Sequence, residues 1–173
     1  MIKDKMNNKY IKELTEKIEK TEFWHGTSSQ TKVEDYDEGI KLLVDTFIKH
    51  KESKSKLFFI GNGGSSAIAS HMTADFMKNG GMNTYSLYDN AVTTCMGNDY
   101  GYEDIFSRPM EFLVREGDLV VAISSLGNSA NIINAVRVAK KRKANVITFT
   151  GFKQDNSVKQ MGTSMFMYPV RSN

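Results

Sequence analysis

The sequence contains a single cysteine, Cys95, among 173 residues, and this excludes an internal disulfide. It also has no CxxC pair and no zinc-finger spacing. No apolar run approaches the ~20 residues of a membrane-spanning helix, and the first residues do not follow the pattern of a signal peptide. We therefore expect a soluble cytoplasmic protein in which Cys95 is a small buried hydrophobe and not a nucleophile.

A strong excess of one charge is missing as well. The chain carries 23 basic and 20 acidic residues, a formal charge of +3, and they are spread along the sequence. No basic patch therefore argues for a nucleic-acid partner, although an anionic small molecule is allowed. There is no internal repeat at a solenoid period. With 40% apolar residues, the chain can bury a core, and its length predicts one domain over residues 1–173.

The most informative stretch is residues 56–75, KLFFIGNGGSSAIASHMTAD. Residues 57–60 form a short unbroken apolar run, which is typical of a strand buried on both faces. Gly61, Gly63 and Gly64 allow a sharp turn, and Ser65 or Ser66 can cap the helix that follows. Such a turn points backbone N–H groups and the positive end of a helix dipole at one spot. We therefore predict a site for an anionic ligand here.

Two helices are predicted before this strand, in residues 1–50. Residues 3–22 and about 33–50 place apolar residues at helical spacing, and residues 24–31 between them are rich in turn-forming residues. Residues 49–56 are a run of Lys, Ser and Glu that predicts a solvated connection. The apolar positions are Met6, Tyr10, Ile11, Leu14 and Ile18 in the first helix and Ile40, Leu42, Leu43, Phe47 and Ile48 in the second.

Strands alternate with helices over residues 56–173. This order predicts βαβ units and a mainly parallel sheet with right-handed crossovers. A long loop is expected through residues 93–100. Further strands are expected at 84–88, 118–124, 145–150 and 165–170, and helices at about 106–114, from Ser129 onward and at about 157–161.

A second loop rich in small residues, 124–129, also follows a strand and opens a helix. In a parallel sheet both loops lie at the carboxyl edge, where α/β folds bind ligands. The hydroxyls of Ser124, Ser125 and Ser129 suit the acceptor oxygens of a phosphate, although a serine-rich turn before a helix is often only a cap. The loop lacks the lysine and the spacing of a P-loop, which argues against nucleotide triphosphate hydrolysis.

Two further patterns leave alternatives open. Gly61 and Gly63, with Asp89 ending the next predicted strand, match part of a dinucleotide fingerprint, but Ser66 stands at its third glycine, so NAD binding is disfavoured. His71 and Asp75 are four residues apart on one helix face. They could be a general base and its partner, two metal ligands, or an ordinary surface ion pair.

Three ordered motifs, FIGNGGSSAIASHMTADF, TTCMGNDYGYEDIFSR and AISSLGNSANII, resemble the sugar isomerase (SIS) domain of the phosphoheptose isomerases, also called sedoheptulose-7-phosphate isomerases. The resemblance covers about residues 56–150. It implies a flavodoxin-like parallel sheet sandwiched by helices and a homotetramer with active sites at subunit interfaces. The implied reaction converts sedoheptulose 7-phosphate to D-glycero-D-manno-heptose 7-phosphate, through a cis-enediol, for bacterial lipopolysaccharide or capsule.

The resemblance also implies roles for single residues. Asp75 stands where the family has a glutamate that acts as base and can bind zinc, and His71 matches a zinc ligand. We therefore expect the Asp75 carboxylate to lie near the two loops, although it is one methylene shorter. Leu126 stands where many members have a serine of the phosphate loop. The implied substrate-binding residues are Asn62, Gly63, Gly64, Asp75, Asn98, Asp99, Ser124, Ser125, Leu126 and Ser129.

Members of the family continue into a long C-terminal helix with a glutamine and a histidine that complete the site. This sequence ends at Asn173 before such a helix, and we expect the natural chain to continue. Two alternatives to the isomerase stay open. One is a non-catalytic scaffold, since proteins that associate with the initiator DnaA use the same domain. The other is a phosphosugar sensor that binds without turnover.

Overall fold

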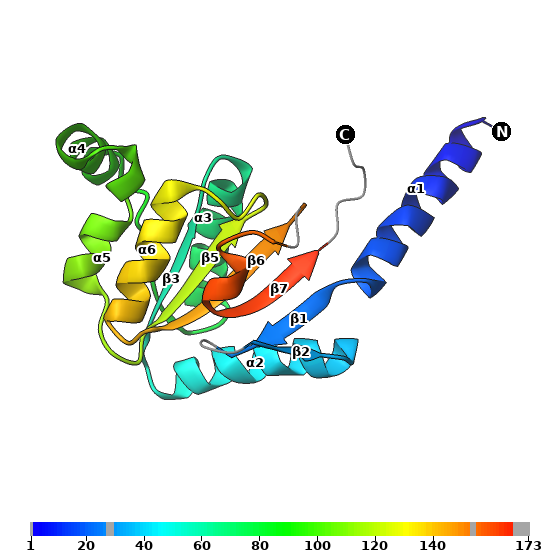
Figure 1. Cartoon of the computed structure of the whole chain (residues 1–173), viewed down its shortest axis with the longest axis horizontal. Coiled ribbons are helices and arrows are strands. Elements are labelled where there is room, and N and C mark those ends of the chain that lie inside the picture. The colour runs from blue at the N-terminus through cyan, green and yellow to red at the C-terminus, as the bar shows by residue number, and fades with distance from the viewer. Residues whose placement is uncertain (1, 27–29, 153–154, 168–173) are drawn as a thin grey trace.

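The computed structural model describes residues 2–26, 30–152 and 155–167, with side chains over 8–26, 30–152 and 155–163. Its centre is one sheet in the order β2-β1-β7-β6-β5-β3-β4 (Figure 1). The five strands from β7 to β4 run parallel, which confirms the predicted parallel sheet. Their bounds are Lys56–Gly61 for β3, Asn83–Tyr85 for β4, Leu119–Ser124 for β5, Asn145–Gly151 for β6 and Thr163–Met167 for β7.

The other edge of the sheet is a hairpin that the sequence did not predict. Strands β1, Glu22–His25, and β2, Thr31–Val33, pair antiparallel, and β1 also pairs antiparallel with β7. The predicted turn over residues 24–31 is therefore wrong at both ends. Phe23 is buried, and both strands are too short for an alternating pattern to stand out against their small, polar neighbours.

Helices cover both faces of the parallel sheet. In Figure 1, α5 and α6 lie on the face turned toward the viewer, and α3 lies behind it. Buried side chains alternate in the same way, because Phe58 and Val120 join the cluster beneath α5 and α6, whereas Phe59 and Val121 join the cluster beneath α2 and α3. The α-helices are α1 Ile2–Glu19, α2 Tyr36–Glu52, α3 Gly64–Lys78, α4 Asn90–Tyr100, α5 Ser107–Leu113 and α6 Ala130–Lys141.

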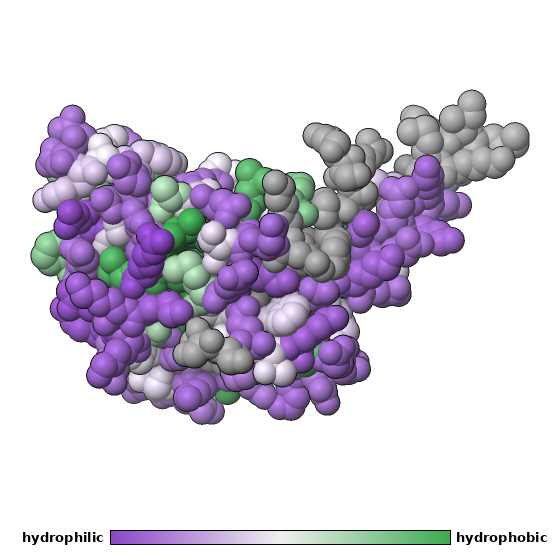
Figure 2. Space-filling model, viewed as in Figure 1, coloured by the Kyte–Doolittle hydropathy of each residue, from purple (hydrophilic) through white to green (hydrophobic). Residues whose placement is uncertain are grey.

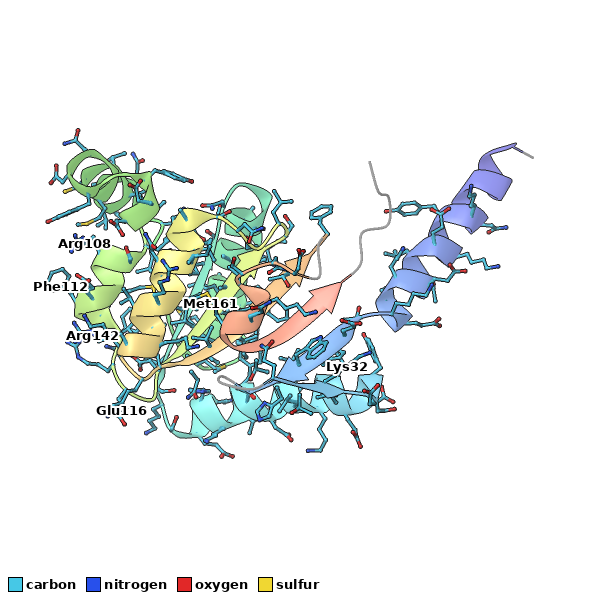
Figure 3. The ribbon with its side chains drawn as sticks, viewed as in Figure 1. Lys32, Arg108, Phe112, Glu116, Arg142 and Met161 are labelled. Atoms are coloured by element: carbon cyan, nitrogen blue, oxygen red, sulfur yellow. The ribbon has the colours of Figure 1, made fainter. Side chains whose placement is uncertain are left out.

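Two short 3₁₀ helices complete the described chain, η1 at Tyr102–Asp104 and η2 at Lys159–Met161. Met161 packs against the buried cluster under α6, whereas Phe112 on α5 is 72% exposed (Figure 3). Helix α1 extends away from the sheet, and its described surface is mostly hydrophilic (Figures 1 and 2). None of the described helices combines the length and the hydrophobicity that a membrane span requires.

Several boundaries differ from the prediction. The expected loop at 93–100 is helix α4, and the strand expected at 84–88 stops at Tyr85. The last strand begins two residues early, and residues 168–170 of the prediction lie outside the described chain. Asp89 caps α4 by accepting a hydrogen bond from the Val92 N–H, which favours a helix in this polar segment. Cys95 lies on the exposed face of α4, so the prediction that it is buried is wrong.

The connection expected at 49–56 is also partly helical. Helix α2 continues to Glu52, and His50 is buried instead of solvated. Its Nε2 lies 3.2 Å from Asn145 Nδ2, and its Nδ1 lies 2.6 Å from Ser55 Oγ. Since an amide Nδ2 can only donate, Nε2 accepts and Nδ1 carries the proton that it donates to Ser55. These polar contacts allow a histidine to be buried in a charged segment.

Candidate functional site

The two glycine- and serine-bearing loops lie side by side at the carboxyl edge of the sheet. Strands β3 and β5 are hydrogen-bonded neighbours, and Gly61 at the end of β3 pairs with Ile123 near the end of β5. The loops at 62–63 and 125–129 begin from these strand ends, and each leads into the N-terminus of a helix. The predicted juxtaposition of the loops is therefore confirmed.

The first loop depends on glycines for two different reasons. Gly63 has φ 55°, a conformation that residues with a side chain rarely adopt. A Cβ on Gly61 would lie 2.7 Å from the backbone of Ser65, so this glycine permits close approach of the chain. Helix α3 begins at Gly64 with Gly63 as its N-cap, so the expected capping by Ser65 or Ser66 is wrong. Ser66 Oγ instead donates to the Gly63 carbonyl, at 2.8 Å.

The second loop, residues 124–129, is called the phosphate loop below. Ser124 is buried, and its Oγ accepts a hydrogen bond from the Gly127 N–H at 3.2 Å, so this hydroxyl shapes the turn. Ser125 is exposed, and Leu126 is 59% exposed. Ser129 is the N-cap of α6, but its side chain makes no capping hydrogen bond. The Ser125 and Ser129 hydroxyls are thus the ones that could meet a ligand, beside the positive end of the α6 dipole.

A polar bridge that sequence reasoning missed ties the two loops together. The Asn62 and Asn131 amides donate to each other at 2.9 and 2.8 Å, and the Tyr102 hydroxyl donates to Asn62 Oδ1 at 3.1 Å. Asn131 is buried in the first turn of α6. A buried amide on a helix face that is otherwise apolar was the available signal, because such a group needs a partner.

The Tyr88 side chain supports the start of the first loop, and this role was not evident from the sequence. Its hydroxyl accepts from the Gly61 N–H at 2.6 Å and donates to the Gly61 carbonyl at 2.9 Å. Burial raises the pKa of the Tyr88 phenol well above its ordinary value, so it stays protonated and can donate. The sequence pattern predicted a strand that includes Tyr88, and this prediction gave no sign that its hydroxyl binds the Gly61 backbone.

The middle-loop residues, Asn98 and Asp99, lie on α4. Both are exposed, and Asn98 Nδ2 donates to Asp99 Oδ1 at 2.8 Å. The chain then passes through Gly101 into η1, which carries Tyr102 to Asn62. Asn98 and Asp99 therefore lie shortly before Tyr102, the residue that contacts the first loop, and their own side chains are open to solvent.

Asp75 does not lie beside the loops of its own chain. It is eleven residues after the start of α3, which corresponds to about 16 Å along the helix axis. Its carboxylate lies 3.4 Å from His71 Nε2 and accepts from Asn79 Nδ2 at 3.2 Å. Asp75 lines a groove of about 360 Å³ together with Phe47, Ile48, Phe76 and Met82. Within one chain, Asp75 therefore does not adjoin the phosphate loop, because the helix carries it toward the opposite end of the strands.

His71 and Asp75 share one helix face, as predicted, and both are accessible, with side chains 72% and 43% exposed. An imidazole and a carboxylate at this spacing fit two positions of a tetrahedral zinc site, which needs four ligands. Among the described residues no group of three or more His, Cys, Asp or Glu side chains is arranged to hold a metal ion. The described part of one chain therefore offers these two side chains and no complete set of metal ligands.

Residues 25–151 match the SIS domain family. The phosphoheptose isomerase of Akkermansia muciniphila is 36% identical over 123 residues, which cover 68% of this chain and 63% of that protein. The alignment thus spans less than two thirds of this curated relative.

Solved structures agree with this match. The phosphoheptose isomerase of Francisella tularensis superposes with a TM-score of 0.76 at 26% identity, covering 98% of this chain and 85% of the other. Phosphoheptose isomerase GmhA of Neisseria gonorrhoeae gives a TM-score of 0.68 at 27% identity, covering 100% and 88%. The family match, the parallel sheet and the two adjoining loops agree: the chain belongs to the SIS domain family.

Proposed function

We propose that the protein is a phosphoheptose isomerase that converts sedoheptulose 7-phosphate to D-glycero-D-manno-heptose 7-phosphate. The observation that carries this proposal is the pairing of the Asn62 loop with the phosphate loop through the Asn62–Asn131 bridge. The relatives and solved structures named as phosphoheptose isomerases support the same reaction.

The phosphate group of the substrate would bind at the N-terminus of α6. Ser125 and Ser129 can donate hydroxyl hydrogen bonds there, and the helix dipole favours the negative charge. Leu126 offers no hydroxyl and is 59% exposed, so it would contact the ligand through apolar surface only. The sugar would extend from this point toward Asn62, Gly63 and Gly64, with Asn98 and Asp99 on the adjoining segment.

The catalytic base would come from a second copy of the chain. Asp75 lies about 16 Å along α3 from the loops of its own chain, so its carboxylate does not adjoin a sugar bound at those loops. The outer faces of α2 and α3 expose apolar side chains that association would cover, and a homotetramer with sites at subunit interfaces fits this arrangement. These side chains are Ile40, Val44 and Ile48 on α2 and Ile68 and Met77 on α3.

The reaction is a proton transfer between neighbouring carbons. Asp75 would remove a proton from the hydroxyl-bearing carbon beside the ketone while the ketone oxygen gains a proton, giving a cis-enediol. It would then return its proton to the former carbonyl carbon while the neighbouring hydroxyl loses its proton, so that an aldose results. Acid–base help of this kind contributes on the order of 10² to 10⁴ in rate. Zinc held by His71, Asp75 and further ligands could polarise the sugar oxygens.

The product indicates the biosynthetic role of the enzyme and the compartment in which it would act. A heptose 7-phosphate is a precursor for the heptose of lipopolysaccharide or capsule, and its synthesis would take place in the cytoplasm. The substrate is the partner that the site requires; neither a nucleic acid nor a membrane is needed.

A direct assay tests the proposal. The protein should form heptose 7-phosphate from sedoheptulose 7-phosphate, and Asp75→Asn should abolish turnover while sugar-phosphate binding persists. Binding without turnover in the unmodified protein would support a sensor instead, and neither binding nor turnover would support a scaffold. An active Asp75→Asn variant would remove Asp75 from the mechanism.

A further inference from the structure

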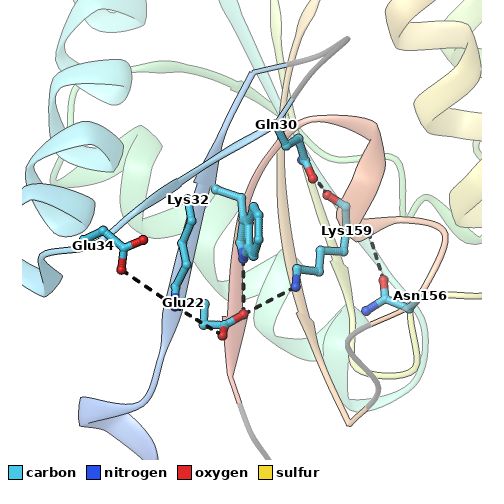
Figure 4. A network of polar contacts seen from close by, with 7 residues as sticks. Glu22, Gln30, Lys32, Glu34, Asn156 and Lys159 are labelled. Carbon is cyan, nitrogen blue, oxygen red and sulfur yellow. Dashed lines mark hydrogen bonds and ion pairs between the residues drawn. The ribbon is translucent and has the colours of Figure 1, made fainter.

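Outside the loops, an ion pair with little exposure to solvent joins the hairpin to η2, the 3₁₀ helix between β6 and β7. Lys159 in η2 places its Nζ 3.4 Å from Glu22 Oε2 on β1, and the two side chains are only 7% and 14% exposed. The same Nζ lies 4.6 Å from the centre of the Trp24 ring, and Trp24 Nε1 donates to Glu22 Oε2 at 3.2 Å. Figure 4 shows this cluster together with Lys32 and Gln30.

The Glu22 carboxylate is charged in this cluster. Burial alone would raise the pKa of Glu22, but the Trp24 hydrogen bond and the charges of Lys159 and Lys32 outweigh it and lower the pKa below its ordinary value. Lys159 therefore faces a full negative charge. Removing one member of such a pair leaves the other buried charge with less compensation, which costs free energy.

The backbone of Lys159 is fixed as firmly as its side chain. Gln30 Nε2 donates to the Lys159 carbonyl at 2.8 Å, and the Lys159 N–H donates to Asn156 Oδ1 at 2.9 Å. Asn156 is fully buried. Residues 156–159 are thus held by the hairpin at one end and by their own turn at the other.

These four residues in turn hold the phosphate loop. The Val158 N–H donates to the Gly127 carbonyl at 2.9 Å, and the Ser157 N–H donates to Asn128 Oδ1 at 3.0 Å. Gly127 has φ 66°, and a Cβ there would lie 2.0 Å from Asn156 Oδ1, so the two segments touch without space between them. A shift of residues 156–159 must therefore move Gly127 and Asn128.

We propose that the Glu22–Lys159 ion pair positions the phosphate loop, so that the β1–β2 hairpin determines how tightly the proposed site binds a sugar phosphate. Lys159 and Glu22 are positioning residues, because they act through residues 156–158 and not by touching the ligand. The inference rests on the proposed function for the role of the loop, but the mechanical connection can be tested separately.

The test compares Lys159→Met and Glu22→Gln with a matched control, Lys32→Met. Lys32 pairs with the same Glu22 carboxylate at 3.6 Å, but its side chain is 38% exposed and lies on β2. Hydrogen–deuterium exchange of a peptide covering residues 124–131 measures the loop directly. Its exchange should rise about tenfold in Lys159→Met and Glu22→Gln, remain near the unmodified value in Lys32→Met, and recover in Lys159→Arg.

The affinity for sedoheptulose 7-phosphate and the kinetics give a second readout. The Kd and KM should rise about tenfold in Lys159→Met and Glu22→Gln, while kcat changes by less than about twofold, because the catalytic base is not involved. Should Lys159→Met not fold, the isosteric Glu22→Gln decides the question. Unchanged exchange at 124–131 in the folded variants, equal changes over all peptides, or the same effect from Lys32→Met would overturn the proposal.

The outcomes separate this inference from the proposed function. A protein that shows neither binding nor turnover of sedoheptulose 7-phosphate refutes the proposed function, while the exchange of residues 124–131 still decides whether the ion pair positions the loop. Turnover combined with an unperturbed loop in Lys159→Met and Glu22→Gln leaves the isomerase standing and refutes the inference.

Discussion

The side chains of Asn62 and Asn131 exchange two hydrogen bonds, of 2.9 and 2.8 Å, across the space between the loop after β3 and the first turn of α6. Each amide uses both its donor and its acceptor in the pair, and the Tyr102 hydroxyl adds a third bond to Asn62 Oδ1. This reciprocal pair ties the loop after β3 to the start of α6.

Truncation of Asn131 to Ala should therefore affect both stability and binding. The change leaves the Asn62 amide without its buried partner, at a cost of about 1–3 kcal/mol in the free energy of unfolding. The KM for the sugar phosphate should rise as well, because the loops are no longer held together. Urea denaturation and steady-state kinetics measure the two effects.

Asn83→Ala is the control for this variant, since Asn83 is exposed on β4 and, among the described residues, its side chain donates only to the Lys54 carbonyl, at 3.4 Å. It should change stability by less than about 0.5 kcal/mol. An Asn131→Ala protein as stable as the control would show that the bridge contributes nothing.

The separation of Asp75 from the loops predicts complementation between inactive variants. Asp75→Asn lacks the base, and Ser129→Ala lacks a phosphate-loop hydroxyl, so each should be inactive or severely impaired alone. If a site takes its base from one copy and its phosphate loop from another, mixed assemblies contain some sites with neither defect. Unfolding and refolding the two variants together should restore up to about a quarter of the activity.

The same treatment of each variant alone is the control and should restore nothing. Absence of complementation in mixtures shown to contain mixed assemblies would place Asp75 and the phosphate loop in one chain's site.

The architecture was predictable because its signals are strong and local. The apolar runs of β3 and β5 are buried on both faces, and each ends in a turn of small residues, so the sheet and the meeting of the loops followed from pattern alone. The predicted His71–Asp75 pair also forms as expected, because helical spacing determines it.

What the pattern missed depends on contacts between distant segments. The strands of the β1–β2 hairpin are short, and their position against β7 could not be read from residues 22–33 alone. The partners of Asn131, Tyr88 and Lys159 lie 69, 27 and 137 residues away along the chain. The hydrogen-bond partners of such buried polar side chains are determined by the tertiary structure, and local sequence propensity does not reveal them.

Zinc binding should depend on His71. Replacement by Ala removes one of the two ligands that α3 can offer and should weaken zinc binding by at least about tenfold. Zinc content after dialysis against the metal and titration calorimetry measure this without reference to activity. His25→Ala is the matched control, because His25 is an exposed histidine on β1. Equal zinc affinity in both variants would exclude His71 as a ligand.

His50 should make stability depend on pH in the acid range. Burial lowers the pKa of His50, the nearby Lys49 charge adds to this effect, and Asp118 opposes it. The folded protein therefore keeps His50 neutral at pH values where the unfolded chain, with an ordinary pKa of about 6.5, already binds a proton. Stability from this group is complete above about pH 6.5 and falls as the pH drops toward the lowered folded pKa.

His50→Gln isolates this contribution, because glutamine can keep a hydrogen bond but does not titrate. Urea midpoints between about pH 5 and pH 7.5 should fall more steeply with acid in the unmodified protein than in the variant. Parallel pH profiles would show that His50 is protonated equally in the folded and unfolded chains.

Phe23 of the hairpin packs closely against Gly39 of α2. A Cβ on Gly39 would lie 2.2 Å from two ring carbons of Phe23, which is buried and packs edge-on against Tyr36. Gly39→Ala should therefore destabilise the protein by about 1–3 kcal/mol, even though alanine favours a helix over glycine by about 1 kcal/mol.

The control is Gly64→Ala, where an added Cβ meets no atom within 4 Å and the backbone is not strained. This variant should be as stable as the unmodified protein or slightly more stable. Combining Gly39→Ala with Phe23→Leu should cost less than the sum of the two single changes, because the smaller side chain makes room for the methyl group. Additive costs would mean that Phe23 and Gly39 do not constrain each other, and that the hairpin is held on α2 by other contacts.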